Sequence, residues 1–359
     1  MFVMILYHMQ KELTSNSTAT TVYYDAAGRE LQTTQHGVTP TAKDLVSHIV
    51  YDSLGRKVQE WAALPLGTQG GTYVPLDAFT SSDYSTAFHV DISHEPMTGG
   101  RVLAETGGTT PGKAVTYEYG YNKAKQELTV THYSVYAATT ICNNGVYEYN
   151  SLSYTKQTDE DGFTVIIFKD DKERTVLERR RGVYSNAFLD TYYVYDALGR
   201  LICVLPPSAV EATMNEGTYT LSDTEELEQF AYFYGYDHRG RCTSLKKPGT
   251  GWFYTVYDAD SRPVLTATPE QQTRNEWSFV KYDGLGRVIQ EGTVTNTASQ
   301  LQLISHFDSI SVRESVDFRT PYGYTGNILM GTSPVLLKTN FYDDYSFFTQ
   351  YQFQNIFLP

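Results

Sequence analysis

The chain of 359 residues is rich in aromatic side chains, with 30 Tyr and 17 Phe, and only 19% of its residues are charged. Aromatic residues suit half-buried strands, so this composition favours an all-β fold over a helical one. The net charge of −13 argues against nucleic-acid binding, which needs clustered Lys and Arg to neutralise phosphates. No segment approaches the roughly 20 apolar residues of a transmembrane helix, so we expect no membrane span.

The N-terminal residues are set apart from the rest. The apolar stretch Met1–Tyr7 is too short for a signal peptide and has no basic residue before it, and a polar run at 14–21 follows. We therefore expect residues 1–20 to form a poorly ordered or truncated N-terminal segment.

A hexapeptide of the form Tyr-Asp-x-x-Gly-Arg organises the chain after residue 20. Five intact copies and one copy that has lost its Gly recur, and neighbouring Tyr positions such as Tyr24 and Tyr51 are 27 residues apart. This interval fits two strands and two turns, so each repeat is predicted to be a β-hairpin. The predicted turn residues are Tyr24, Asp25, Gly28, Arg29, Tyr51, Asp52, Gly55, Arg56, Tyr195, Asp196, Gly199, Arg200, Tyr236, Asp237, Gly240, Arg241, Tyr257, Asp258, Arg262, Tyr282, Asp283, Gly286 and Arg287.

Each residue type in the hexapeptide has a physical reason to be there. Tyr ends the incoming strand with a large amphipathic ring, and Asp accepts hydrogen bonds from backbone N–H groups in the turn. Gly tolerates the positive φ that a tight hairpin requires. Arg begins the return strand, close enough to Asp for a charge-assisted hydrogen bond. A fainter copy is found at Lys169–Arg174.

Other segments interrupt the hairpins. Residues 64–110 are rich in Gly, Pro, Ser and Thr, which indicates long loops with one short helix near Asp77. Residues 207–230 predict a helical insertion, with a capping box at Ser222–Glu225.

The sequence contains no motif that demands catalysis. The carboxylates at Asp159–Asp161, Asp170 and Asp171 are interpreted as solvated turns rather than a glycosidase pair, and Cys142, Cys203 and Cys242 as core residues. The histidines, including His36, His48 and His238, lack metal-ligand spacing, and no nucleophile elbow or phosphate loop is present. We therefore expect a non-enzymatic protein with no cofactor and no metal.

The repeats resemble the YD repeats of bacterial Rhs proteins, of insecticidal toxin-complex components and of teneurins. The resemblance to an Rhs subfamily extends beyond the repeats and covers about residues 21 to 350. The stretches that carry it are Tyr24–Glu60, which contains Gln35–Pro40, and then Trp61–Pro65, Asp159–Pro207 and Gly251–Asp258. The resemblance implies one long sheet that spirals into a hollow shell around a C-terminal toxin or other cargo, in a secreted or cell-surface protein. After Tyr342–Tyr345 the chain contains no core plug, self-cleavage motif or toxin domain of that family, so it resembles an N-terminal fragment.

The predicted fold is all-β, with serial antiparallel hairpins in a curved, spiralling sheet (a partial β-shell) and one or two short helical insertions. The predicted domains are residues 1–20, an entry region at 21–115 with two YD hairpins, and a YD-repeat sheet at 116–359. The predicted function is a scaffold whose partner is the rest of the same polypeptide or its toxin cargo. The alternative is a surface module that binds cell-surface glycans through exposed Tyr and through Trp252 or Trp277.

Overall fold

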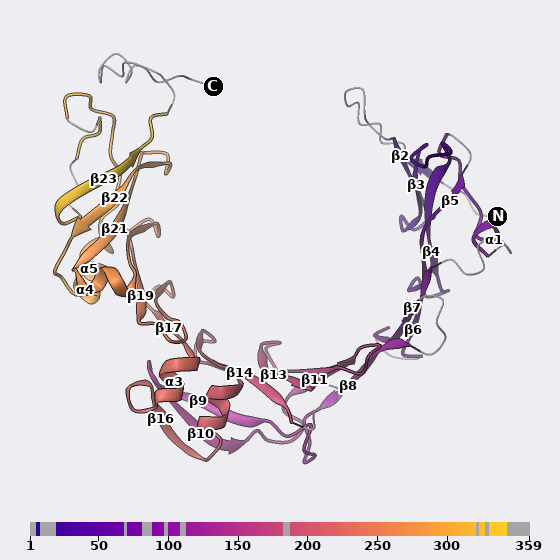
Figure 1. Ribbon diagram of the computed structural model, residues 1–359, viewed down its shortest axis with the longest axis horizontal. Coiled ribbons are helices and arrows are strands. Elements are labelled where there is room, and N and C mark those ends of the chain that lie inside the picture. Colours follow the sequence, from indigo (N-terminus) through magenta and orange to yellow (C-terminus); the bar gives the residue numbers. More distant parts are fainter. Residues whose placement is uncertain are drawn as a thin grey trace. The chain divides into compact units, whose positions relative to one another are not determined.

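The computed structural model describes residues 5–7, 19–67, 70–80, 88–96, 100–107, 113–181, 187–320, 323–326 and 330–342. It forms two compact units, drawn along the chain in Figure 1. Unit 1 comprises residues 1–123, 149–174 and 178–189, and unit 2 comprises residues 124–148, 175–177 and 190–359. Strands hold 49% of the described residues and helices 11%, which confirms the all-β class. Most of the expected N-terminal segment, residues 1–20, lies outside the described residues. Of the stretch Tyr342–Tyr345 named above, only Tyr342 is described.

Unit 1 is a series of antiparallel strands in which each strand pairs with the next one along the chain, except that β8 pairs with β11. The strands are β1 (Ile5–Tyr7), β2 (Thr20–Tyr24), β3 (Glu30–Gln35), β4 (Asp44–Tyr51), β5 (Lys57–Gly67), β6 (His89–His94), β7 (Val102–Gly107), β8 (Ala114–Tyr121), β11 (Ser153–Thr158) and β12 (Thr164–Lys169). Helix α1 (Leu76–Phe79) forms near Asp77, as predicted.

Unit 2 repeats the same arrangement and adds a small second sheet. In the main series, consecutive strands pair antiparallel, and β15 pairs with β17. The small sheet has the order β16–β10–β9. The strands are β9 (Thr131–Ala137), β10 (Thr140–Val146), β14 (Leu189–Tyr195), β15 (Leu201–Leu205), β16 (Gly217–Thr220), β17 (Tyr232–Tyr236), β18 (Cys242–Lys246), β19 (Trp252–Tyr257), β20 (Pro263–Ala267), β21 (Glu276–Tyr282), β22 (Val288–Thr295) and β23 (Thr332–Thr339); β13 (Thr175–Arg181) is divided between the units. The predicted serial antiparallel hairpins are confirmed.

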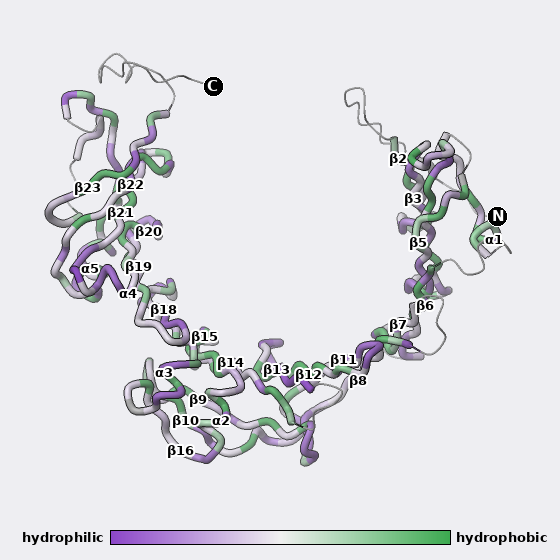
Figure 2. Tube along the Cα trace, in the orientation of Figure 1, coloured by the Kyte–Doolittle hydropathy of each residue, from purple (hydrophilic) through white to green (hydrophobic). Residues whose placement is uncertain are grey.

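The repeat tyrosine marks a β-bulge. In six hairpins the pairing register shifts between the repeat Tyr and the residue before it: at Tyr24, Tyr51, Tyr195, Tyr236, Tyr257 and Tyr282. A bulge increases the local twist and re-aims the side chain at that position. In Figure 2, apolar segments lie within the strands and polar segments lie in many of the turns that join them.

In the part of the chain that the structure describes, five short α-helices accompany the strands, more than the one or two insertions expected. The insertion predicted at 207–230 contains α2 (Pro207–Ala212), the 3₁₀ turn Leu221–Asp223 and α3 (Glu225–Phe230). The capping box predicted at Ser222–Glu225 was wrong, because Thr224 is the N-cap and its side chain makes no capping hydrogen bond. Capping boxes instead start α4 (Pro269–Thr273), at Thr268, and α5 (Gln300–Phe307), at Ser299. Among the described residues, no helix is long and apolar enough to cross a membrane.

The core of unit 2 lies between α5 and one face of strands β19–β22. Leu303 and Phe307 of α5 pack with Val256, Leu265 and Phe279, all of which are buried. In unit 1, a smaller core joins Val46, Trp61, Val74 and Phe79.

The turn glycines provide a test of the hairpin geometry. Gly286 has a φ of +82°, which side chains with a Cβ rarely adopt, whereas Gly284 in the same turn has open space around it and no positive φ. We expect Gly286→Ala to lower the free energy of unfolding by about 1–2 kcal/mol. The matched variant Gly284→Ala is expected to leave it unchanged or slightly raised. Urea unfolding measures both, and equal effects of the two substitutions would contradict the assigned turn.

Candidate functional site

The repeat turns share one set of hydrogen bonds. The backbone N–H of Asp196 donates to the carbonyl oxygen of Arg200 (2.9 Å). The N–H of Gly199 donates to the carbonyl oxygen of Asp196 (2.9 Å). Oδ1 of Asp196 accepts from the N–H of Leu198 and of Arg200, at 3.0 and 2.8 Å, and Oδ2 accepts from Nε of Arg200 at 2.7 Å. The same contacts close the turns at Asp25, Asp52, Asp170, Asp237, Asp258 and Asp283.

These contacts favour the charged form of the turn aspartates. Burial acts to raise the pKa of Asp196, Asp237 and Asp283, but the hydrogen bonds from the backbone and the guanidinium of the turn Arg outweigh it, so each pKa is lowered. The carboxylate is therefore part of the turn structure.

The turn Arg also binds the next repeat. The Arg241 guanidinium lies over the ring of Tyr257, 5.1 Å from its centroid, and Nη1 donates to the carbonyl oxygen of Asp258 at 2.8 Å. The Tyr257 hydroxyl returns a hydrogen bond to the carbonyl oxygen of Cys242, directly after Arg241, at 3.1 Å. A cation–π contact and two hydrogen bonds thus fix one turn against the next.

This arrangement recurs in both units, and we call it the turn ladder. Guanidinium groups lie 4.3–5.1 Å from tyrosine centroids in the pairs Arg29–Tyr51, Arg101–Tyr119, Arg200–Tyr236, Arg241–Tyr257, Arg262–Tyr282 and Arg287–Tyr342. The tyrosine hydroxyl also donates a hydrogen bond to the carbonyl oxygen of the residue that follows the Arg of the preceding turn. The tyrosines that do so are Tyr119, Tyr195, Tyr236, Tyr257, Tyr282 and Tyr342.

Two degenerate copies keep the turn geometry without glycine. Ser261 takes the glycine position with a φ of +62°, and Glu173 does so with a φ of +59°. The Asp258–Arg262 and Asp170–Arg174 contacts are nevertheless formed. The faint copy at Lys169–Arg174 is therefore a turn of the same kind.

Two further repeats escaped the sequence search. Arg101 pairs with Glu95 across a longer turn and stacks on Tyr119. At Asn122 the side-chain amide oxygen accepts from the N–H of Leu152, as the turn Asp does from Arg, with residues 123–149 inserted between. The signals that could have found them are an acidic residue six positions before an Arg, and Tyr121-Asn122 in place of Tyr-Asp.

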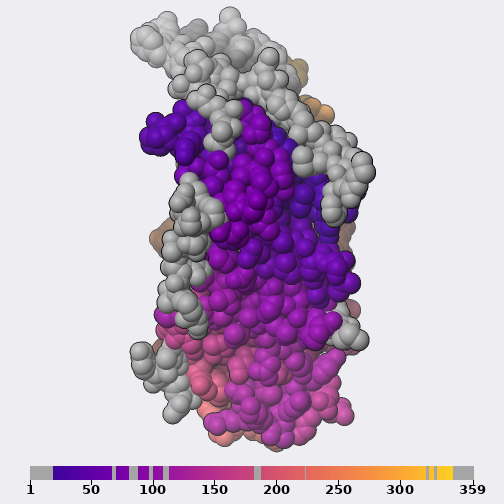
Figure 3. Space-filling model, turned by 90° about the vertical axis from the view of Figure 1, so that its right-hand side faces the viewer, coloured from indigo at the N-terminus to yellow at the C-terminus, as the bar shows by residue number. Residues whose placement is uncertain are grey.

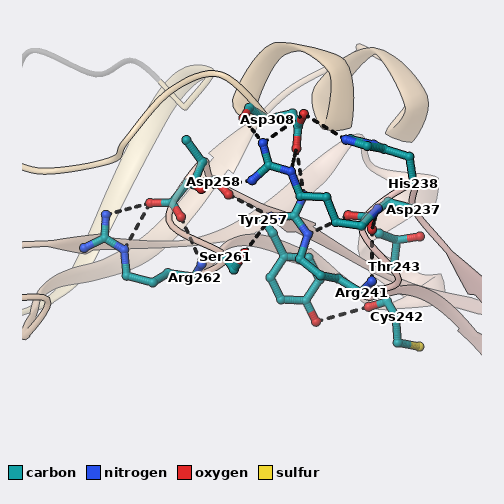
Figure 4. A network of polar contacts seen from close by, with 12 residues as sticks. Asp237, His238, Arg241, Cys242, Thr243, Tyr257, Asp258, Ser261, Arg262 and Asp308 are labelled. Carbon is teal, nitrogen blue, oxygen red and sulfur yellow. Dashed lines mark hydrogen bonds and ion pairs between the residues drawn. The ribbon is translucent and has the colours of Figure 1, made fainter.

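Asp308, the residue after α5, contacts three side chains of the turn at 237–241 and was not predicted (Figure 4). Its Oδ1 accepts from Arg241 at 2.9 Å and lies 3.3 Å from Nε of Arg239, and His238 lies 3.4 Å from Oδ2. The Arg241 and Asp237 side chains are only 11% and 2% exposed. Arg241 therefore pairs with two carboxylates, those of Asp237 and Asp308, in a largely buried part of the ladder.

The other candidate residues do not converge. Trp277 is 4% exposed, within the core and stacked on Tyr254, so little of its ring is accessible to a sugar, and Trp252 is half-buried. Asp159 and Asp170 lie at opposite ends of the six-residue strand β12, about 20 Å apart by strand geometry, too far for a glycosidase pair. Within the described ranges, no three His, Cys, Asp or Glu side chains are placed to hold a metal.

Comparisons with known proteins agree with this fold. A family model described as a domain of unknown function (DUF6443) matches residues 7–106. No curated protein gives a significant match. The crystal structure of TcdB2-TccC3 without its hypervariable C-terminal region is similar over 78% of this chain, with 15% identity and a TM-score of 0.52. That of TcdB2-TccC3-Cdc42 is similar over 79%, with 15% identity and a TM-score of 0.51.

The similarity to these structures concerns the fold. This chain covers 12% and 13% of the two similar chains, so it spans about an eighth of their length.

Replacement of Arg241 tests the ladder. Lys keeps the charge but cannot reach Asp237, Asp308 and the Asp258 carbonyl together while stacking on Tyr257. We expect Arg241→Lys to lower the free energy of unfolding by about 2 kcal/mol. The control is Arg274→Lys, in the exposed pair with Glu270, which should leave stability unchanged. Equal effects of the two substitutions would show that the ladder contributes no more than a surface ion pair.

Acidification tests the turn aspartates. A carboxylate whose pKa is lowered by folding stabilises the native state fully above its ordinary value of 3.8, and this stability is lost as pH falls through the folded pKa. We expect the free energy of unfolding to fall steeply below about pH 4. Asp196→Asn should reduce this slope, whereas the same change at the exposed Asp171 should not. A stability curve that is flat between pH 5 and 3 would argue against the pairing.

Proposed function

We propose that this chain is part of a non-enzymatic Rhs-type scaffold that encloses or presents a polypeptide belonging to the same larger protein. Two findings support the proposal that this chain is part of a longer assembly. Its fold is similar to that of TcdB2-TccC3, and it covers only a small share of those chains. The match of residues 7–106 to one family model supports a separate entry region at 21–115. The resemblance of the repeats to Rhs proteins supports a secreted or cell-surface location.

The observation that carries this proposal is the difference between the two faces of the main strands of unit 2. Cross-strand partners share a face, so the pairing register assigns each side chain. One face carries buried side chains: Tyr192, Cys203, Leu205, Phe233, Val256, Leu265 and Phe279. It is covered in part by β9, where Tyr133 contacts Tyr192, and by α5. In Figure 1, α3, α5 and the small sheet lie on this side.

The opposite face presents aromatic and aliphatic side chains that are only half-buried. We call it the open face, and its residues are Tyr193, Val204, Tyr232, Tyr234, Leu245 and Phe253. The register places Tyr193, Val204 and Tyr232 in one row across the strands, and Tyr234, Leu245 and Phe253 in a second row. Rows of accessible aromatic side chains on a rigid sheet bind apolar side chains of another chain at little entropic cost.

The occupant of the open face is an extended or incompletely folded polypeptide segment. Such a segment exposes apolar side chains, which the two rows bind without specific pockets. The ladder lies at the turns of this sheet and keeps it rigid, so the rows stay in place.

Binding of an unfolded probe tests this function. We expect full-length protein to bind reduced, carboxymethylated lysozyme at 0.15 M salt, measured by fluorescence anisotropy. Leu245→Ser should weaken binding about tenfold, which corresponds to about 1.4 kcal/mol, because it removes apolar area from the open face.

Leu285→Ser is the matched control. Leu285 lies at a turn tip away from the open face and is 79% exposed, so its loss should not change binding. Equal binding by both variants, or no binding by the wild type, would contradict the proposed function.

A further inference from the structure

The segment of residues 70–80 in unit 1 covers one face of strands β2–β5. It contains α1, and in Figure 1 it lies on the side of these strands that faces the viewer in Figure 3. We call it the cover segment. Its contacts combine buried hydrogen bonds with an apolar cluster that includes one histidine.

Buried polar groups hold the backbone of the cover segment. The fully buried Asp44 carboxylate accepts from the N–H of Gly71 (2.7 Å) and of Gly37 (2.8 Å). The fully buried Gln32 side chain accepts from the N–H of Val74 (2.9 Å) and donates to its carbonyl oxygen (2.6 Å). The fit is close at Gly71, where an added Cβ would lie 1.9 Å from Nε2 of His36.

His48 lies at the centre of the apolar contacts. It is 4% exposed, and its ring lies 5.4 Å from that of Phe79 and 6.2 Å from that of Tyr73. Phe79 also packs on Trp61, with ring centroids 5.8 Å apart. Nε2 of the Gln32 amide lies 3.4 Å from Nδ1 of His48. The amide nitrogen is a donor, so it suits a neutral ring that accepts at Nδ1 and opposes a protonated one.

Among the residues that the structure describes, the elements packed around His48 supply no charge that would compensate an imidazolium. Tyr23 on β2 and Tyr73 in the cover segment are neutral, and burial raises the pKa of both. Gln32 on β3, Trp61 on β5 and Phe79 on α1 carry no charge; Asp77 of α1 is exposed. The Asp44 carboxylate on β4 accepts hydrogen bonds from two backbone N–H groups. The ring of His89 on β6 stacks on that of Trp61.

We propose that His48 makes the cover segment acid-releasable, so that mild acidification uncovers the face of β2–β5 formed by Val46 and Trp61. Protonation places a charge among Phe79, Tyr73 and Trp61, and release of the segment gives the imidazolium access to water. The buried ring thus couples pH to the exposure of an apolar face.

The sign of the effect follows from linkage. Burial lowers the pKa of His48 below its ordinary value of 6.5. Its contribution to closure is therefore full above pH 6.5 and is lost as pH falls below that value towards the folded pKa. This window lies above the one in which the turn aspartates are protonated.

Hydrogen exchange of the Gly71 and Val74 amides measures release in the full-length protein. We expect their protection factors, corrected for intrinsic exchange rates, to fall by up to about 30-fold between pH 7.5 and 5, the limit set by 1 + 10^(6.5 − 5). His48→Phe should abolish this dependence. His306→Gln, which alters an exposed histidine on α5, should leave it unchanged.

A second measurement keeps the test decisive if His48→Phe fails to fold. NMR titration of wild-type His48 should give a midpoint below 6.5. Protection that does not change with pH, a His48 midpoint at or above 6.5, or an unaltered pH dependence in a folded His48→Phe variant would each overturn the proposal.

Discussion

The contact on which the rest of the structure depends is the one between a turn arginine and the tyrosine of the next repeat, which recurs in both units. An isolated two-stranded hairpin is marginally stable in water, so a chain of hairpins needs contacts that join neighbours as well as contacts that close turns. Arg241 serves both purposes, because it pairs with Asp237 in its own turn and stacks on Tyr257 in the following one. Repetition of this contact fixes each hairpin beside the next along the turn edge of the sheet, and the half-buried rows of the open face depend on that regular placement.

The ladder also explains how the sheet accommodates large insertions. Residues 123–149 are inserted where a turn would otherwise be, and Asn122 still bonds to Leu152 on the far side of the insertion. Because the entropy of closing a loop rises only slowly with its length, a long insertion costs little once the flanking strands are paired. Insertions of this kind give unit 2 its small sheet and short helices without interrupting the series of hairpins.

The hairpins could be predicted from the sequence because turn chemistry is local. Asp, Gly and Arg at fixed spacing meet within six residues, so their roles follow from backbone geometry alone. The contact from Arg29 to Tyr51 joins residues from different repeats, and only the pairing register brings them together. For the same reason Asp308 and the cover segment could not be anticipated: their partners at Arg241, Gln32 and Asp44 are distant in sequence. The burial of Trp277 depends on α5, a helix whose capping box was overlooked.

The central claim is that Arg and Tyr of successive repeats interact directly, and a double-mutant cycle measures this most directly. Arg241→Ala and Tyr257→Leu, alone and together, would be compared by urea unfolding. The account predicts a coupling free energy of about 1–2 kcal/mol between these neighbours, and none between Arg241 and Tyr282, one repeat further on. Additive effects for Arg241 and Tyr257 would contradict the account.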